Sequence, residues 1–323
     1  MELPLELKEE LEKEIQSASI KELKQCAQKV SERYREDSKI KTKNKLINSN
    51  EEALAYAVSR MPATYGSIHT ALENTIKIAN IDIQSVLDIG AGTGSAEWAI
   101  LDLMQVDDIT CIENETYMMQ MGKRLMQNNE TLKNTKWMQL NIAQEQIDQK
   151  ADLVIASYVL NEIEEKTREQ ILEKLWQATN KILLIIEPGT PEGYKEINSI
   201  RKYFIGNKVN IVAPCQHSGE CKIGHDDWCA FSCRVARSKI HKILKDGEIP
   251  YEDEKFSYIA ISKFETEKLD GVVLRHPKID SGKITIKVCK SNGEIEEKII
   301  TKKEKEIFKK AKKCQLKYKL FGF

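Results

Sequence analysis

The sequence predicts an α/β protein built on a doubly wound, mainly parallel sheet, and three observations support this prediction. Short hydrophobic runs alternate with helical patterns between residues 85 and 187. A glycine-rich turn follows the first of these runs. The chain has 323 residues, 41% of them hydrophobic, so it can bury a substantial core. Short strands separated by helices pair in parallel through right-handed crossovers, which is the doubly wound arrangement.

The N-terminal region is predicted to be helical. Apolar residues recur with a period near 3.6 in residues 4–36, which predicts two helices. The same pattern returns in residues 51–72, where Pro62 interrupts it. The intervening segment, EDSKIKTKNKLINSN, is polar and rich in Lys and Asn, so we predict a linker or an exposed loop there.

The central and C-terminal elements follow in order, and they divide the chain into three predicted segments. The later runs FSYIAIS, GVVLRH and KITIKVC are separated by loops, so they are expected to form an antiparallel edge or a small additional sheet. We predict a helical region at 1–80, a cofactor-binding core at 81–205 and a cysteine-rich segment with a basic tail at 206–323. Strands are expected near 85–90, 108–113, 136–141, 151–158 and 181–187, and helices near 95–104, 115–127, 165–179 and 191–204.

Composition limits the classes of protein to consider. Lys plus Arg and Asp plus Glu both number 50, so the overall charge indicates nothing about an acidic partner. The sequence has no run of about twenty apolar residues, and its start is acidic and amphipathic rather than a signal or transit peptide. We therefore expect a cytoplasmic protein without a membrane span. In a reducing cytosol, clustered cysteines are more often metal ligands, cluster ligands or redox groups than disulfides.

The stretch VLDIGAGTGSAEWAI at 86–100 predicts a strand, a glycine turn and a helix. Gly90, Gly92 and Gly94 allow the backbone to turn sharply and to approach a ligand closely. Ser95 stands where the dinucleotide fingerprint has its third glycine, which argues against NAD. Glu113 ends the next strand, where a carboxylate can accept hydrogen bonds from both ribose hydroxyls of an adenosine. The alternative is an ordinary glycine turn of an α/β fold.

These residues resemble motif I and its acidic partner in class I methyltransferases that use S-adenosylmethionine. By this resemblance Asn141 lies near the adenine and Ser157 near the methionine end. ASYVLNEI, after the fourth strand, lacks the Asn/Asp-Pro-Pro-aromatic motif, and we identify no catalytic base in the sequence. The cofactor-binding residues that the resemblance implies are Asp88, Gly90, Ala91, Gly92, Gly94, Glu113, Asn141 and Ser157.

Four of the eight cysteines lie in CQHSGECKIGHDDWCAFSC, residues 215–233. They are separated by five, seven and three residues, so paired C-x2-C zinc knuckles are absent. Irregular spacing, with glycines at 219 and 224, suits a loop around an iron–sulfur cluster. The alternatives are a zinc site completed by His217 or His225, a redox cysteine pair, and cysteines without a common role.

The segment APCQHSGECKIGHDDWCAFSCRVARS resembles the ribosomal small-subunit methyltransferase-like family, which comprises mitoribosomal small-subunit assembly proteins and their bacterial relatives. SERYR, LAYAVSRMPATY, SYVLNEI and EPGTPEGY match it as well. The resemblance implies a [4Fe-4S] cluster held by Cys215, Cys221, Cys229 and the distant Cys289. Zinc remains the alternative metal, and Cys233 the rival to Cys289. The C-terminal AKKCQLKYKLFGF departs from the family, which leaves the role of Cys314 open.

The same resemblance implies the small ribosomal subunit and its rRNA as partners. Two functions are compatible with it: an rRNA methyltransferase, or a non-catalytic assembly factor in which cofactor and cluster are structural or sensing elements. The sequence does not indicate an oligomeric state. The cations expected to contact phosphates are Arg234, Arg237, Lys239, Arg275 and the basic tail from Lys302 to Lys319, although a charged run is often only a solvated face.

Overall fold

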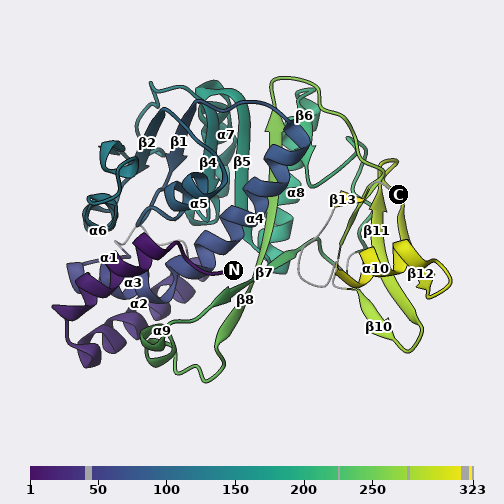
Figure 1. Cartoon of the computed structure of the whole chain (residues 1–323). Helices are drawn as coiled ribbons and strands as arrows, with labels where there is room; N and C mark the ends of the chain where they lie inside the picture. The colour runs from purple at the N-terminus through teal and green to yellow at the C-terminus, as the bar shows by residue number, and fades with distance from the viewer. Residues whose placement is uncertain (41–45, 225, 275–276, 314–319, 322–323) are drawn as a thin grey trace. The chain divides into compact units, whose positions relative to one another are not determined.

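The computed structural model describes residues 1–40, 46–224, 226–274, 277–313 and 320–321 (Figure 1). Within these ranges the chain forms two compact units, each made of separate stretches of sequence. The first unit consists of Met1–His69, Asp82–Leu183 and Arg234–Glu254, and the second of Thr70–Ile81, Leu184–Cys233 and Lys255–Phe323. The status of 1–80, 81–205 and 206–323 as domains stays a prediction. His225, Arg275, Cys314, Lys317, Lys319 and the Lys313 side chain lie outside what the structure describes.

The predicted strands and helices from residue 85 onward are present. β1 (Ser85–Ile89) pairs in parallel with β2 (Asp108–Glu113) on one side and with β4 (Ala151–Ser157) on the other. β3 (Lys136–Gln139) pairs in parallel with β2. Strands β5 (Thr179–Pro188), β8 (Tyr251–Ser262) and β6 (Asn210–Ala213) continue the sheet, giving the order β3-β2-β1-β4-β5-β8-β6. β6 and β8 are antiparallel, so the sheet is mixed.

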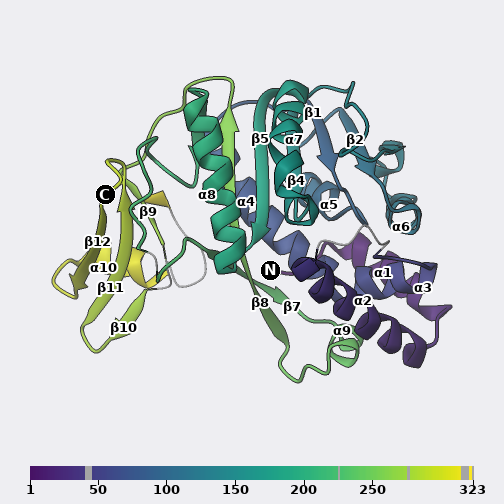
Figure 2. The same cartoon turned by 180° about the vertical axis from the view of Figure 1, so that it is seen from behind.

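In the first unit, helices surround the strands. β1 and β4 are almost wholly buried, because their side chains are apolar on both faces. Helices α1, α2 and α3 lie together next to α9, as Figures 1 and 2 both show. The helical elements that begin in this unit are α1 (Leu5–Gln16), α2 (Ile20–Ile40), α3 (Asn50–Ser59), α4 (Met61–Ala79), α5 (Ser95–Leu103), α6 (Thr116–Met126), η1 (Leu132–Asn134), η2 (Leu160–Glu162), α7 (Glu165–Ala178) and α9 (Lys239–Leu244).

The segment predicted as a linker is partly structured. Helix α2 continues to Ile40, beyond the predicted helix end at residue 36. Leu46 and Ile47 are buried, so this end of the segment is not an exposed loop. Ser49 caps α3 by accepting a hydrogen bond from the backbone N–H of Glu52. Pro62 lies in the first turn of α4, where its missing N–H costs no helical hydrogen bond.

The second unit contains a small sheet beyond the main one (Figure 2). β11 (Lys283–Lys290) pairs antiparallel with β9 (Gly271–Val273), β10 (Lys278–Asp280) and β12 (Ile295–Thr301), and β13 (Leu320–Phe321) pairs with β9. Helix α10 (Lys305–Lys313) packs on this sheet through Ala311, Ile307 and Phe308. The unit also holds α8 (Pro191–Gly206) and the start of β7 (Phe231–Ala236). The run FSYIAIS thus joins the main sheet, whereas GVVLRH and KITIKVC contribute to the small one.

No helix in the described part of the chain is both long enough and apolar enough to span a membrane.

Candidate functional site

The glycine turn between β1 and α5 has the conformation that its composition predicts. Gly90, Gly92 and Gly94 have φ angles of 67°, 58° and 87°, a region that disfavours any side chain. A Cβ on Gly90 would lie 2.3 Å from the Val159 side chain, and one on Gly94 would lie 2.1 Å from Met126. Ala91 is buried within the turn. All three glycines are therefore required by the backbone, and two of them also by close packing.

Glu113, at the end of β2, braces this turn. Its carboxylate accepts a hydrogen bond from the backbone N–H of Gly92 at 2.7 Å and another from Glu115 at 2.7 Å. Burial raises the pKa of Glu113, although these two backbone N–H groups oppose the shift. A carboxylate has about four acceptor positions, so two remain for ligand hydroxyls. The predicted role at a ribose is compatible with this geometry and stays a prediction.

Asp88 belongs to a buried acidic cluster. Burial, followed by the neighbouring charge of Glu97, raises the pKa of Asp88 well above its usual range. Glu97, on α5, is fully buried and accepts a hydrogen bond from the Cys111 thiol at 2.9 Å. Sequence analysis missed Glu97, although a glutamate between Ala96 and Trp98 in an apolar helix start was the available signal.

The other two predicted cofactor residues follow β3 and end β4. The Asn141 side chain accepts a hydrogen bond from the backbone N–H of Ala143 at 3.0 Å, so it shapes the turn after β3. Ser157 is buried as the last residue of β4. Asn141 follows β3 and Ser157 ends β4, so both residues lie at the carboxyl ends of strands, as the glycine turn after β1 does. Doubly wound sheets bind ligands at these ends. The roles of Asn141 and Ser157 stay predictions.

Polar side chains interact just beyond β4. Tyr158 has a φ of 59°, which is unusual for a residue with a side chain. Its hydroxyl donates to the Ser67 hydroxyl at 2.9 Å and lies 3.4 Å from a Glu254 oxygen. Arg60 pairs with Glu254 at 3.0 Å and lies over the Tyr158 ring. These contacts hold Tyr158 in place, and the next residue, Val159, then covers Gly90.

The buried polar atoms around the turn provide a test for a bound cofactor. Thr93 Oγ1 is buried without a hydrogen-bond partner. Asp88 and Glu97 share a hydrogen bond, which requires one of the two carboxyl groups to be protonated. Most buried polar atoms are paired, so Thr93 Oγ1 beside a turn that lacks side chains is available to a polar ligand. S-adenosylmethionine, which carries hydroxyl and ammonium donors, fits this turn.

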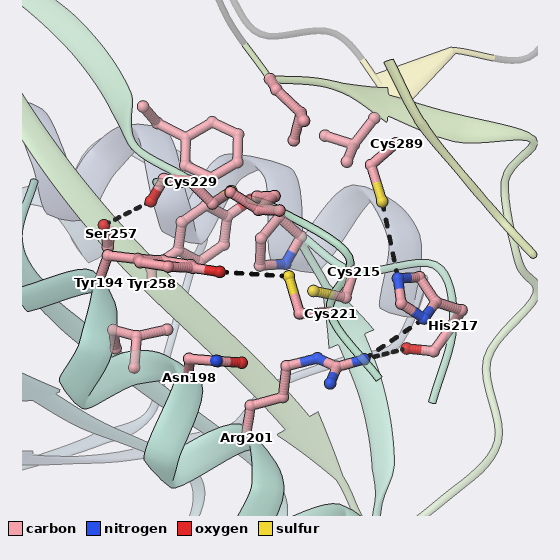
Figure 3. A pocket seen from close by; sticks show the side chains of 16 residues that line it. Tyr194, Asn198, Arg201, Cys215, His217, Cys221, Cys229, Ser257, Tyr258 and Cys289 are labelled. Atoms are coloured by element: carbon pink, nitrogen blue, oxygen red, sulfur yellow. Dashed lines mark hydrogen bonds between the residues drawn. The ribbon is translucent and has the colours of Figure 1, made fainter. Parts of the chain in front are cut away.

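In the second unit, Cys215, Cys221, Cys229 and Cys289 line one cavity (Figure 3). The first three come from the segment between β6 and β7, and Cys289 comes from β11. Cys233 is buried in β7 and is not among the residues that line this cavity. The structure thus brings together the four predicted ligands and leaves the rival aside, while their role as ligands stays a prediction.

Two of these thiols have polar neighbours. The Tyr194 hydroxyl lies 3.3 Å from Cys221 Sγ, and His217 Nε2 lies 3.6 Å from Cys289 Sγ (Figure 3). Burial and the hydrogen bond with Cys221 raise the pKa of Tyr194, so its hydroxyl remains a donor. Burial and the charge of Arg201 lower the pKa of His217.

The thiols also influence one another. Burial, then the proximity of Cys215 and Cys221, raises the pKa of Cys289 to about 12. The pKa of Cys229 rises for the same reasons, with Cys289 contributing. Neighbouring thiolates repel each other, so a cation among them would be needed to ionise all four. Thiols around a cavity are suitable donors for a cluster or zinc. No three His, Cys, Asp or Glu side chains in the described ranges are arranged to hold a single metal ion.

The family-like stretch EPGTPEGY contacts the cysteine segment. Trp228 donates through its indole N–H to the carbonyl of Gly189 at 3.0 Å, and Tyr194 reaches Cys221. Asp227 pairs with Lys287 of β11 at 2.8 Å. These contacts connect α8, the cysteine segment and β11. They therefore give residues 187–194 and 227–229 a common structural role.

Two arginines predicted to contact phosphates are engaged within the chain. Arg234 forms two hydrogen bonds with Asp253 and stacks on Tyr251. Arg237 pairs with Glu252, which also bonds His241 and Lys245. Both guanidinium charges are therefore matched by carboxylates, and we no longer assign these arginines to RNA. Lys239 is exposed.

Comparison with known proteins identifies the family. Residues 50–317 match the family described as mitochondrial small ribosomal subunit Rsm22. This chain belongs to the Rsm22 family. The family predicted from the cysteine segment and the accompanying motifs is thereby confirmed.

Relatives of this Rsm22 chain carry related names. The human ribosome assembly protein METTL17, mitochondrial, is 20% identical over 274 residues, which are 77% of this chain and 58% of METTL17. Rsm22-cox11 tandem protein 2, mitochondrial, of Schizosaccharomyces pombe is 23% identical over 310 residues, covering 79% of this chain and 41% of that protein. The chain thus spans less than two thirds of the length of these curated relatives.

Two solved methyltransferases have a low similarity to this chain. Magnesium protoporphyrin IX methyltransferase from Synechocystis, with bound S-adenosylmethionine, has a TM-score of 0.43 and 12% identity, covering 72% of this chain and 90% of its own. The N-methyltransferase NodS from Bradyrhizobium japonicum has a TM-score of 0.41 and 10% identity, covering 61% and 86%. The strand order with an antiparallel strand, together with the glycine turn after β1, identifies the class I methyltransferase fold with a mixed sheet in this Rsm22 chain.

The predicted cytoplasmic location is wrong. The description of the Rsm22 family and the names of its relatives all specify the mitochondrion. The prediction rested on the amphipathic, acidic start of the sequence, which carries no information about the family's compartment.

Proposed function

We propose that this chain acts on the small ribosomal subunit, binding S-adenosylmethionine at the glycine turn and a four-cysteine iron–sulfur cluster in the cavity. One observation carries the proposal: Cys289, about sixty residues beyond the other three cysteines, lines the same cavity as they do. The family description and the METTL17 name both connect relatives with the small subunit or with ribosome assembly.

S-adenosylmethionine, when bound, supplies an electrophilic methyl group on a sulfonium centre. The glycine turn allows the cofactor to approach the backbone of Gly92, and Glu113 keeps that backbone in position. Asp88 and Glu97, which share a hydrogen bond, and the unpaired Thr93 hydroxyl lie nearby. Val159, against Gly90, excludes water from one side of the turn. These residues orient a cofactor, and alignment of reacting groups is worth several kcal/mol in methyl transfer.

We propose rRNA methylation as the activity, with a non-catalytic assembly factor as the second candidate. The contacts after β4 favour this second candidate. Arg60 pairs with Glu254, and the Tyr158 hydroxyl is bonded to Ser67, so these polar groups satisfy one another instead of facing a substrate. In the second candidate, the cofactor and the cluster brace the surfaces that bind the subunit.

Metal analysis tests the cluster. The chain should be purified without oxygen, and iron, acid-labile sulfide and zinc measured for wild type, Cys289→Ser and the matched control Cys233→Ser. We expect near-stoichiometric iron and sulfide in wild type and in Cys233→Ser, and a large loss in Cys289→Ser, because Cys289 lines the cavity and Cys233 does not. Zinc without sulfide would refute the iron–sulfur assignment, and the absence of any metal would refute the metal site altogether.

A further inference from the structure

Arg201 is a buried cation in the wall of the cysteine cavity. It lies on α8, only 4% of its surface is exposed, and it lines the cavity together with the four cysteines (Figure 3). One guanidinium nitrogen donates to the carbonyls of His217 at 3.0 Å and Gly219 at 2.6 Å. The Nε–H of Arg201 is buried without a hydrogen-bond partner. The hydrogen-bonding capacity of this side chain is therefore only partly used by the protein.

The charge of Arg201 has no carboxylate partner among the residues that the structure describes. Its hydrogen bonds go to carbonyl oxygens, to the His217 ring and to the Cys215 side chain, and none of these partners is a carboxylate. Other partly buried arginines of this chain do have such partners: Arg33 pairs with Glu52, and Arg237 with Glu252. An unpaired buried charge costs several kcal/mol, so a cation in this position requires an anion. The anions available in the cavity are the cysteine thiolates.

Arg201 also reaches Cys289 through His217. Arg201 Nη2 lies 3.4 Å from His217 Nδ1. On the other side of the same ring, His217 Nε2 lies 3.6 Å from Cys289 Sγ. Arg201 thus helps to hold the imidazole between α8 and the Cys289 sulfur.

From these observations we propose that Arg201 is the charge-compensating and positioning residue of this site, and that the cavity accepts a group whose thiolate-ligated form is a net anion. The inference rests on the proposed function, in which four thiolates hold the group. Four thiolates around a [4Fe-4S] core or a zinc ion leave a net negative charge. The guanidinium offsets this charge where water cannot, and it connects the loop carbonyls and His217 around the same group.

A buried cation near a cluster affects its reduction potential. Reduction adds negative charge, so a neighbouring positive charge favours the reduced form. We expect Arg201→Gln to shift the midpoint potential to more negative values and to speed the loss of iron to a chelator. Arg201→Lys retains the charge but not the two-carbonyl contact, so it should stay close to wild type in potential while losing iron faster. If Arg201 had only a structural role, both variants would lose iron faster and neither would change the midpoint potential.

The test compares wild type, Arg201→Gln, Arg201→Lys and the control Lys202→Gln, which removes one exposed charge from the next position of α8. Iron, sulfide and zinc contents, midpoint potential and the rate of metal loss to a chelator are measured for each protein. The proposal is supported by a negative shift in Arg201→Gln that Arg201→Lys and Lys202→Gln do not show. If the bound metal is zinc, support is a lower zinc affinity in Arg201→Gln than in Lys202→Gln.

The two levels of failure are distinguishable. If wild type holds metal and Arg201→Gln matches Lys202→Gln in potential or zinc affinity, the role of Arg201 is refuted while the metal site stands. If Arg201→Gln retains no metal, Arg201→Lys is compared with wild type. A midpoint potential of Arg201→Lys that is clearly more negative than that of wild type refutes charge compensation. If wild type itself holds neither metal nor sulfide, the proposed cluster and this inference both fail.

Discussion

Buried carboxyl groups dominate the chemistry of single residues at the glycine turn. Asp88, Glu97 and Glu113 are all at most 8% exposed. Burial raises the pKa of each of them, because the interior disfavours the ionised form. Only Glu113 has its charge offset by two backbone N–H donors. A ligand that donates hydrogen bonds to Asp88 and Glu97 would therefore offset part of the free energy that burial of these carboxyl groups costs.

This arrangement predicts how stability depends on pH. The folded pKa of Asp88 is raised above its unfolded value of about 3.9, so the folded protein holds the proton more tightly. Its contribution to stability is complete below pH of about 4 and is lost as pH rises toward the folded pKa. In the absence of cofactor, Asp88→Asn should weaken the fall in the free energy of unfolding between pH 5 and pH 7.5. The free energy of unfolding is measured by denaturant titration at both pH values.

The control for this prediction is Asp148→Asn, which removes an exposed carboxylate. It should retain the pH dependence of wild type. An equal pH dependence in wild type and Asp88→Asn would mean that Asp88 is ionised in the folded protein.

The sequence identified most site residues but not the buried charges. The three glycines and Glu113 were predicted from their spacing and their position after a strand, whereas the set of four cavity cysteines came from the family resemblance. Glu97 and Arg201 were not predicted, because a charged letter in a helix is normally read as solvent-exposed. Arg234 and Arg237 were misread for the opposite reason: their carboxylate partners lie about fifteen to twenty residues away on β8, and pairing across strands is not visible in a linear pattern.

At the scale of elements, helix α10 has an apolar face that packs on the small sheet and an opposite face that exposes lysines. Ile307, Phe308 and Ala311 pack on the small sheet, which anchors the helix. The outward side, with the turn before it, exposes lysines, whereas Glu304 is bonded to Thr301 and Glu306 to Lys309. The net positive surface supports the proposed contact with rRNA phosphates. Four exposed lysines here have no carboxylate partner within the described ranges, namely Lys302, Lys303, Lys305 and Lys312.

Replacing these four lysines by Gln should weaken binding to the small ribosomal subunit. Each phosphate contact steepens the salt dependence of log affinity by about 0.7 to 0.9, so the loss of four contacts should reduce the slope by roughly 3 to 3.5. The affinity should fall about tenfold or more at low salt. The measurement is a binding titration at several salt concentrations.

A matched variant carries Gln at Lys21, Lys29, Lys123 and Lys150, which are exposed in the first unit. It changes the net charge equally but leaves α10 intact, and it should keep the wild-type slope. Equal slopes for both variants would exclude α10 as the RNA-binding face.

The element boundaries were predictable where packing follows local pattern. The strands around the glycine turn and helices α5 to α8 agree with the prediction within a few residues, since their apolar periods are strong. The linker predicted at 36–50 was wrong at its two ends, while residues 41–45 lie outside the described part of the chain. Leu46 and Ile47 are too few to show a period, yet they are buried. The late strands were predicted to form an antiparallel edge or a small additional sheet. β8 joins the main sheet, whereas β9 and β11 belong to the small one. Long-range strand pairing decides this assignment, and a local sequence pattern does not show it.

At the scale of the whole molecule, the two candidate functions differ in what the cofactor does. Both need the class I fold, the cysteine cavity and a surface for RNA. Only a methyltransferase needs the cofactor's methyl group to reach an acceptor. The glycine turn lies in the first unit and the cysteine cavity in the second, so substitutions at one site test it without altering the residues of the other.

Methyl transfer to small-subunit assembly intermediates decides between them. With labelled S-adenosylmethionine, Asp88→Ala should reduce transfer by roughly twofold to tenfold, the effect of losing a neutral hydrogen bond of about 0.5–1.5 kcal/mol. Asp148→Ala should transfer normally, and both variants should bind the subunit as wild type does, since neither alters α10. Transfer at wild-type rates by Asp88→Ala would remove Asp88 from the cofactor site. Binding without any transfer by wild type would leave the assembly factor, with cofactor and cluster as supports for the RNA-binding surface.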